Sequence, residues 1–144
     1  MQSTFTQAQS LNILTHAPAP QVKALADELL PALEQSGNLE VVQNRTGLVM
    51  LPARDTVHGT LFHLGEVLVA EAEVRQNSFV GYGAVLGRDL EQALAVALLD
   101  LAWQTEIAPE RLSQFLEAAH SAQLAAHNLL FSKVEATRVQ METF

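Results

Sequence analysis

The N-terminal part of the chain carries the hydrophobic periodicity of helices. Within residues 20–36 the apolar side chains recur at intervals of three and four, which places them on one face of a helix. These side chains are Val22, Leu25, Leu29 and Leu33. Gly37 follows as a helix stop, and Pro31 predicts a kink or a split. Residues 5–16 predict a further helix before this one.

Strand patterns replace the helical period in the glycine-rich middle of the chain. All but one of the seven glycines fall within residues 47–87. Residues 40–43 and 47–51 are short segments rich in Val, Leu and Met, which favour strands. Pro52 and the polar residues 55–59 then predict a loop. We therefore expect two short strands around a turn, followed by that loop.

A longer strand and its antiparallel partner follow. Residues 64–74 alternate between two faces, and one of these faces is polar in its second half. Asn77 and Ser78 predict a turn, after which residues 79–86 return as an antiparallel strand. The pattern predicts a mainly antiparallel sheet of three to five strands in the middle of the chain.

The last third of the chain is helical again. Asp89 is placed to cap a helix over residues 90–104. Apolar residues surround the axis of that helix, so we expect it at the centre of the domain or shared with another chain, with Asp100 as a buried carboxylate. A final helix is expected over residues 109–133, and the alternation from Thr137 is compatible with an edge strand.

This order of elements predicts an α+β fold, with N-terminal and C-terminal helices packed on the sheet. A chain of 144 residues has the size of one domain, and we expect a single domain over residues 1–144. Apolar residues make up 49% of the chain, which is more than one small core readily hides. We therefore expect an apolar surface that a partner covers.

Charge and the remaining composition exclude several classes of function. The 8 Lys and Arg against 16 Asp and Glu give a formal net charge of −8, which disfavours a general nucleic-acid binder. The longest nearly apolar run, residues 93–102, is about half the ~20 residues that a membrane-spanning helix needs. Lys23 is the first positively charged side chain, so the sequence shows no secretory signal and we expect a cytoplasmic protein.

Four residues are candidates for binding a substrate or another anion: Arg54, Glu66, Tyr82 and Arg88. The two arginines offer paired donors that fit a phosphate or phosphonate, and the alternatives are a salt bridge for Arg88 and a solvated loop position for Arg54. Glu66 needs a partner or a shifted pKa if it is buried, and the alternative for it is a structural ion pair. The nearby glycines have the spacing GxGxxxG, which matches neither a dinucleotide fingerprint nor a P-loop.

Five residues are candidates for a protein interface. Gly81 and Gly83 lie on one face of a strand, where bare backbone lets a helix or another subunit approach closely. Leu94, Leu98 and Leu99 belong to the apolar helix that follows. We expect this flank of glycine and leucine to dock on a partner, and an isolated chain to form homo-oligomers or dissolve poorly.

No catalytic or metal-binding motif is complete in the sequence. The five His lack the i, i+4 pair of H-E-x-x-H, and the absence of Cys removes thiolate ligands and thiol nucleophiles. No Ser, Thr or Lys stands in a motif such as G-x-S-x-G or S-x-x-K. We expect no catalytic residue, no metal and no cofactor bound by this chain alone.

An ordered set of short motifs is densest between residues 46 and 100. It consists of Gly47-Leu48-Val49-Met50, Arg54, Gly59, Phe62, Gly65-Glu66, Gly81-Tyr82-Gly83, Gly87-Arg88-Asp89 and the closing segment Ala136-Thr137-Arg138-Val139. In order and spacing, this set resembles the PhnG family, the G subunit of the bacterial carbon-phosphorus lyase system. The chain departs from the family pattern at Thr56-Val57, where a Gly-Gly pair is usual, and at Arg45, where an acidic residue is usual.

The resemblance implies a subunit that assembles with the H, I and J subunits into a core complex. With H, I and the ATPase-like L subunit it would serve the first committed step, the α-D-ribose 1-methylphosphonate 5-triphosphate synthase reaction. In that step a phosphonate displaces the adenine of ATP, so ATP is a substrate of the complex. The family assigns the chemistry mainly to the I subunit, which leaves this chain an organising role.

Two other hypotheses stay open from the sequence. In one, the four anion-binding candidates line a phosphate or phosphonate site that belongs to this chain. In the other, the chain is a free-standing small-molecule or phosphate-binding regulatory module.

Overall fold

The structure, a computed structural model, describes residues 4–139 and has an α+β fold. Its elements are α1 (Gln7–His16), α2 (Ala19–Ser36), β1 (Leu39–Arg54), β2 (Leu61–Gln76), β3 (Phe79–Leu86), α3 (Leu90–Gln104) and α4 (Pro109–Ala136). The strands form one antiparallel sheet in the order β1-β2-β3. The predicted fold class is therefore confirmed.

Local sequence signals explain where several helices begin. The Thr6 hydroxyl accepts from the backbone N–H of Gln9, whose side chain accepts from the Thr6 N–H, so α1 starts with a capping box. The Asp89 carboxylate caps α3 by accepting from Gln92, and Lys23 pairs with it at 2.9 Å. The helix α2 continues through Pro31 to Ser36, so of the two predicted effects of Pro31, a kink or a split, the split is wrong.

The β1–β2 hairpin is longer than the sequence pattern predicts. Residues 40–43 and 47–51 belong to one strand of 16 residues, because the polar residues between them continue the pairing with β2. The register shifts between Val41 and Gln43 and again between Leu51 and Pro52. Residues 137–139, where the predicted edge strand would begin, are not in a strand. The remaining residues of that predicted strand lie outside the described part of the chain.

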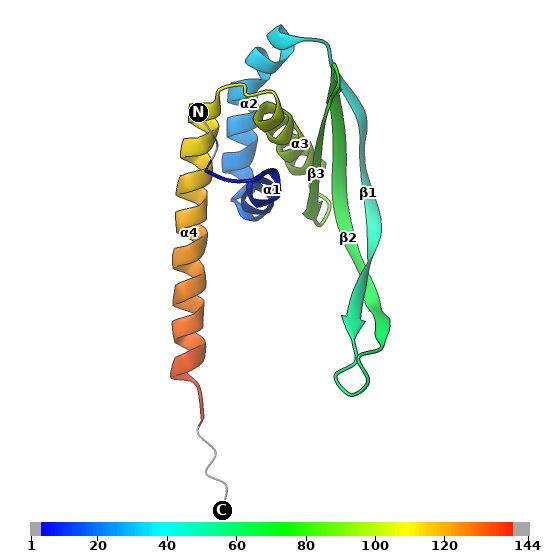
Figure 1. Cartoon of the computed structure of the whole chain (residues 1–144), viewed down its shortest axis with the longest axis vertical. Coiled ribbons are helices and arrows are strands. Elements are labelled where there is room, and N and C mark those ends of the chain that lie inside the picture. The colour runs from blue at the N-terminus through cyan, green and yellow to red at the C-terminus, as the bar shows by residue number, and fades with distance from the viewer. Residues whose placement is uncertain (1–3, 140–144) are drawn as a thin grey trace, which may run out of the picture.

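The helix α3 packs on one face of the sheet, which we call the inner face. This face presents Ala70, Ala72 and Val74, which are fully buried. All helices of the described residues lie on this side of the sheet (Figure 1), so the outer face has no helical cover. The predicted central position of α3 is confirmed, since a helix that is apolar all round is surrounded by other elements.

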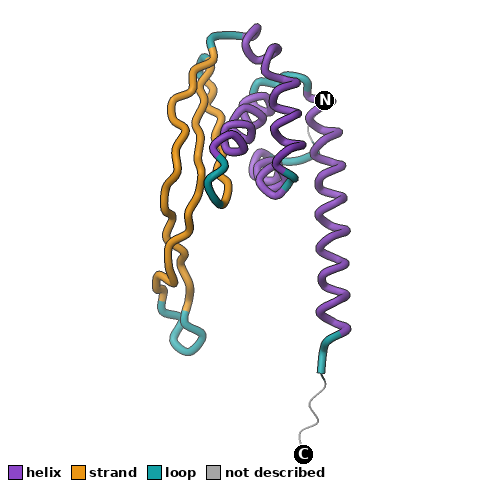
Figure 2. Tube along the Cα trace, turned by 180° about the vertical axis from the view of Figure 1, so that it is seen from behind, coloured by secondary structure: helices purple, strands orange, loops and turns teal. Residues whose placement is uncertain are grey.

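Two arms project from this body in the same direction. One is the β1–β2 hairpin and the other is the C-terminal half of α4, which lies on the opposite side of α1 and α3 (Figures 1 and 2). The strand β3 ends opposite Val69, so residues 48–68 form a two-stranded ribbon with its connecting loop. We call residues 48–68 the distal ribbon.

Candidate functional site

The four anion-binding candidates do not meet in one place. Arg54 is opposite Leu61 at the tip of the hairpin, whereas Tyr82 is opposite Glu73 near its base. At about 3.3 Å per residue along β2, these two rows are separated by about 40 Å. The structure therefore gives no support to a single anion site built from all four candidates.

Three of these candidates have few or no side-chain contacts with the rest of the chain. The Arg54 guanidinium donates to the carbonyl oxygen of Gly59 at 3.1 Å, which closes the loop at the hairpin tip. Glu66 lies on β2 opposite Met50, and Arg88 lies in the turn between β3 and α3; both side chains are exposed. Neither makes an ion pair or hydrogen bond through its side chain with residues 4–139. Arg54 thus acts as a loop brace, and Glu66 and Arg88 do not form a pair.

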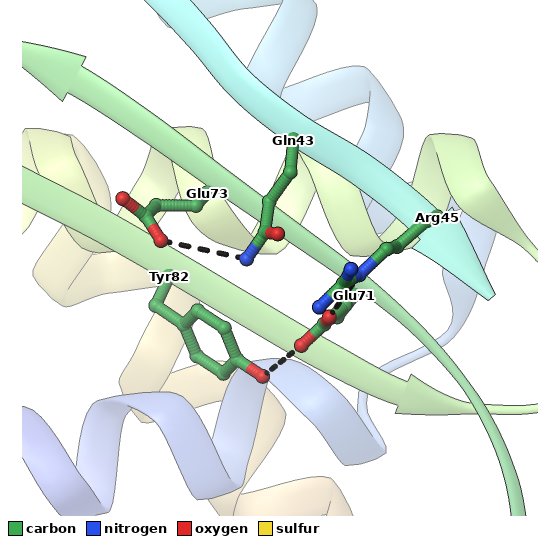
Figure 3. A network of polar contacts seen from close by, with 5 residues as sticks. All are labelled: Gln43, Arg45, Glu71, Glu73 and Tyr82. Carbon is green, nitrogen blue, oxygen red and sulfur yellow. Dashed lines mark hydrogen bonds and ion pairs between the residues drawn. The ribbon is translucent and has the colours of Figure 1, made fainter. Parts of the chain in front are cut away.

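Tyr82 belongs to a polar cluster on the outer face of the sheet (Figure 3). Its hydroxyl donates to one oxygen of Glu71 at 2.7 Å, and the Nε of Arg45 donates to the other oxygen at 2.7 Å. The amide of Gln43 donates to Glu73 at 3.5 Å in the next row. These contacts join all three strands across the open face.

The bonds to Glu71 shift two pKa values in opposite directions. The hydrogen bond from Tyr82, then that from Arg45, lowers the pKa of Glu71, and the same bond to Glu71 raises the pKa of Tyr82. A carboxyl whose pKa falls on folding stabilises the fold at neutral pH and loses that contribution as the pH drops through the folded-state pKa. Both oxygens of Glu71 are engaged by Tyr82 and Arg45, so the cluster is a cross-strand brace and offers no free cation for an anion.

Asp100 is the most buried carboxylate of the described residues, with 2% of its surface exposed. Its oxygens accept from the side chains of Gln7 and Gln104 and from the backbone N–H of Tyr82, each at 3.0 Å. Burial raises its pKa, and the three hydrogen bonds oppose that shift. The prediction of a buried carboxylate at this position is confirmed, and its role is to join α1, α3 and β3.

Substitutions at Asp100 test whether this joint needs the acceptor or the charge. We expect Asp100→Asn to change the free energy of unfolding at pH 7 by less than about 1 kcal/mol, because Gln7 can turn its amide to accept from the new NH2 group. Asp100→Leu leaves the Tyr82 N–H without an acceptor and is expected to cost about 3 kcal/mol.

Urea unfolding across the pH range provides the measurement. An acid whose pKa is raised on folding favours the folded state at low pH and loses this contribution as the pH rises through the folded-state pKa. Asp100→Asn should therefore remove the decrease in the free energy of unfolding that Asp100 causes as the pH rises. The contribution of Glu71, which decreases as the pH falls, should remain. An Asn variant as unstable as the Leu variant would show that the negative charge itself is required.

The flank of Gly81, Gly83 and Leu99 is not exposed in the folded chain. A Cβ at Gly81 would lie 2.3 Å from the carbonyl oxygen of Ala97, and one at Gly83 would lie 2.4 Å from that of Ala93. The prediction that this flank faces a partner is therefore wrong, because α3 of the same chain covers it. The alternative, close approach of a helix, is the one that the structure contains.

The two other interface candidates occupy the edge of that helix. Leu98 is buried and Leu94 is half-buried. Both border a depression of about 610 Å³ between α2, α3 and the start of β1. A role for Leu94 and Leu98 in a protein interface stays a prediction.

The exposed apolar surface lies on the distal ribbon instead. Leu48, Met50 and Leu64 are 63%, 57% and 65% exposed. By strand alternation, Leu48 and Met50 point to the inner face and Val49 and Leu51 to the outer face. A run that is apolar on both faces is typical of a strand buried on both sides. The signal was present in the sequence at residues 48–51, and it indicates a surface made to be covered.

The helix α4 continues this pattern on the second arm. Leu112 and Leu116 are buried against the body, and Gln123 donates to the carbonyl oxygen of Ile13 at 2.9 Å. Beyond that point the apolar stripe continues at helical spacing through Leu130 and Val134, which are exposed. The end of α4 therefore carries an apolar face without a cover among the described residues.

One cavity in the described part of the chain does not suit a phosphonate or nucleotide. It measures about 850 Å³ and lies where α1, α3 and α4 begin or end. Glu106, Glu110 and Glu117 line it beside Phe5 and Trp103, and none of the four anion-binding candidates is among its lining residues. Three carboxylates disfavour the binding of an anion.

Neither a metal-binding cluster nor a membrane-spanning helix occurs among the described residues. Within residues 4–139, no group of three or more acidic or His side chains is placed to hold a metal ion. No helix in that range combines the length and apolarity needed to cross a membrane.

The fold and these surfaces define a small α+β protein that presents two apolar arms. A family model described as phosphonate metabolism protein PhnG matches residues 6–144. The chain therefore belongs to the PhnG family, and the resemblance drawn from the sequence motifs is confirmed. This membership connects the chain with phosphonate metabolism.

Proposed function

We propose that this chain is an organising subunit of the carbon-phosphorus lyase system. Its distal ribbon and the end of α4 dock on partner subunits, and the assembled complex transfers the ribose triphosphate moiety of ATP to an alkylphosphonate. The observation that carries the proposal is the exposure of an apolar ribbon on both of its faces. A two-stranded ribbon is marginally stable in water by itself, so its burial by a partner supplies a reason for its composition.

The partners proposed are the H, I and J subunits, with the L subunit joining for the ribosyl transfer step, in the cytoplasm. The distribution of polar groups agrees with a supporting role, since Arg54 braces a loop, Tyr82 braces the sheet and Asp100 joins elements of the body. Each of these side chains makes a contact within the chain. The chain would therefore contribute assembly and leave the chemistry to another subunit.

Reconstitution of the transfer step tests this function. Purified H, I and L subunits are mixed with ATP and methylphosphonate, with and without this chain, and adenine release is followed. We expect adenine release to require the chain, because the other subunits would lack the surface on which they assemble. Equal adenine release in its absence would remove the proposed role.

A calorimetric titration separates this role from an anion site within the chain. The isolated chain is titrated with ATP and with methylphosphonate, and we expect no heat of binding for either. Binding by the isolated chain that is lost in an Arg54→Gln or Arg88→Gln variant would support the alternative of a phosphate-binding module.

A further inference from the structure

The two edges of the sheet differ in how their backbone groups are satisfied. On β3, the outward N–H of Tyr82 donates to Asp100 and the outward carbonyl of Val80 accepts from Gln104, so side chains of α3 cap this edge. Capping blocks the pairing of another strand. The edge on β1 has no such cap among residues 4–139.

The direction of the backbone groups on β1 follows from the ladder. The carbonyl of Leu68 accepts from Gly87, so the backbone groups of Leu68 point to the β3 side. Leu48, which lies opposite Leu68, therefore forms a non-hydrogen-bonded pair with it. The N–H and carbonyl of Leu48 point away from β2. By alternation, Thr46 and Met50 also point outward. No hydrogen bond from residues 4–139 reaches these outward groups.

Both ends of this free stretch are closed to pairing. At the base, the register shift between Val41 and Gln43 bends the strand, and at the tip Pro52 has no N–H and follows a second register shift. Between them lies a regular segment, residues 44–51, with charge only at Arg45, whose side chain is held by Glu71. A free edge with these features is open to β-augmentation.

We propose that residues 44–51 of β1 accept an extended strand of a partner subunit, which lengthens the sheet by β-augmentation. This inference rests on the proposed function, since it specifies how a partner of the complex docks. The added strand is apolar on both faces, because it lies beside Leu48 and Met50 on the inner face and beside Val49 and Leu51 on the outer face.

The available area favours a partner subunit over a second copy of this chain. Large apolar side chains are exposed on both faces of the distal ribbon as well as along its edge, so a partner that covers all of them needs a broad interface and not strand pairing alone. A symmetric pairing of β1 with a second β1 would cover the edge but leave both faces of the distal ribbon open. Two copies would also each bring a formal net charge of −8.

A proline substitution isolates the contribution of the backbone. Leu48→Pro removes an outward N–H and spares the ladder with β2, while the control Leu48→Ala removes most of the same side chain and keeps the N–H. Both are compared with the wild-type chain for assembly with co-expressed H, I and J subunits. We expect Leu48→Pro to weaken assembly at least about 100-fold and Leu48→Ala less than about tenfold.

Amide hydrogen exchange shows where the strand is added. In the isolated chain, we expect fast exchange at Leu48 and Met50 and slow exchange at Val49, whose N–H points to β2. On assembly with the partners, Leu48 and Met50 should become protected. In Leu48→Pro, retained protection of Val49 would show that the hairpin is intact.

Each other outcome overturns the inference. Equal assembly of the Pro and Ala variants, or unchanged exchange at Leu48 and Met50 in the complex, would show that side chains dock without strand pairing. A wild-type dimer in light scattering that Leu48→Pro converts to monomer would assign the edge to a second copy. A wild-type chain that joins no complex overturns both this inference and the proposed function, whereas an intact complex with an unprotected edge overturns this inference alone.

Discussion

A triple variant of the distal ribbon, Met50→Thr with Phe62→Thr and Leu64→Thr, is expected to lose its place in the complex and keep its own fold. All three side chains are exposed, so their replacement removes few contacts within the chain. At about 25 cal/mol per Å² of apolar surface, the loss of three large side chains from an interface weakens binding by about 3–4 kcal/mol, or at least about 100-fold. Threonine keeps the strand propensity.

Co-purification with tagged I subunit and size-exclusion chromatography of the isolated chain measure the two effects. The triple variant should fail to co-purify, should self-associate less than the wild type and should keep the same thermal midpoint. The control is Ala24→Gln, an exposed position on α2 away from both arms, for which we expect normal assembly. Wild-type co-purification of the triple variant would remove the distal ribbon from the interface.

The second large effect is expected in the body of the isolated chain. In Gly83→Ala, the new Cβ would lie 2.4 Å from the Ala93 carbonyl oxygen and 2.7 Å from the Ala97 nitrogen, both of them backbone atoms of α3. Backbone atoms of a packed helix cannot yield locally, so α3 has to move away from β3. We expect a loss of about 3 kcal/mol or more in the free energy of unfolding, which is a large part of the ~5–15 kcal/mol of a typical domain.

Gly47→Ala is the matched control for that experiment. Gly47 also lies in a strand, but a Cβ there meets no atom within 4 Å. We expect Gly47→Ala to leave the free energy of unfolding unchanged or to raise it by up to ~1 kcal/mol, because Ala has the smaller conformational entropy when unfolded. Urea unfolding compares the two variants. Equal stability of both would show that α3 does not cover β3 in the isolated chain.

The sequence predicts the helices well because each has its own local signals. Thr6 and Asp89 cap helices, Gly37 and the apolar periodicity bound α2, and the start of α3 at Leu90 follows from Asp89. The length of the hairpin was not predicted, since Asn44-Arg45-Thr46 have the composition of a turn. These residues remain in the strand because Arg45 pairs across the sheet with Glu71, which no local pattern reveals.

The main difference between the sequence prediction and the structure is the location of the exposed apolar surface. An apolar helix and a pair of bare glycines are equally compatible with cover by the same chain or by another, since periodicity identifies a buried face without identifying what buries it. The structure assigns Gly81 and Gly83 to α3 of the same chain. The surplus of apolar residues is instead carried by the distal ribbon and by the end of α4.

The candidate site residues illustrate a further limit of the sequence. Residue type and local sequence identify Arg54, Glu66, Tyr82 and Arg88 as candidates, but they carry no information about the distances between these residues in the sheet. The hairpin separates Arg54 from Tyr82 by most of its length. Tyr82 has a defined role only through Glu71, a partner that becomes apparent when the register of β2 and β3 is known.

The most direct test of the docking surfaces is oxidative footprinting. It compares how fast side chains on the two arms are modified in the assembled complex and in the isolated chain. Met50 and Phe62 on the distal ribbon and Phe131 on α4 are exposed in the isolated chain and should be modified readily. If partner subunits cover both arms, modification of all three should fall sharply in the complex. Modification at the isolated-chain rate in an intact, active complex would contradict the assignment of these arms as docking surfaces.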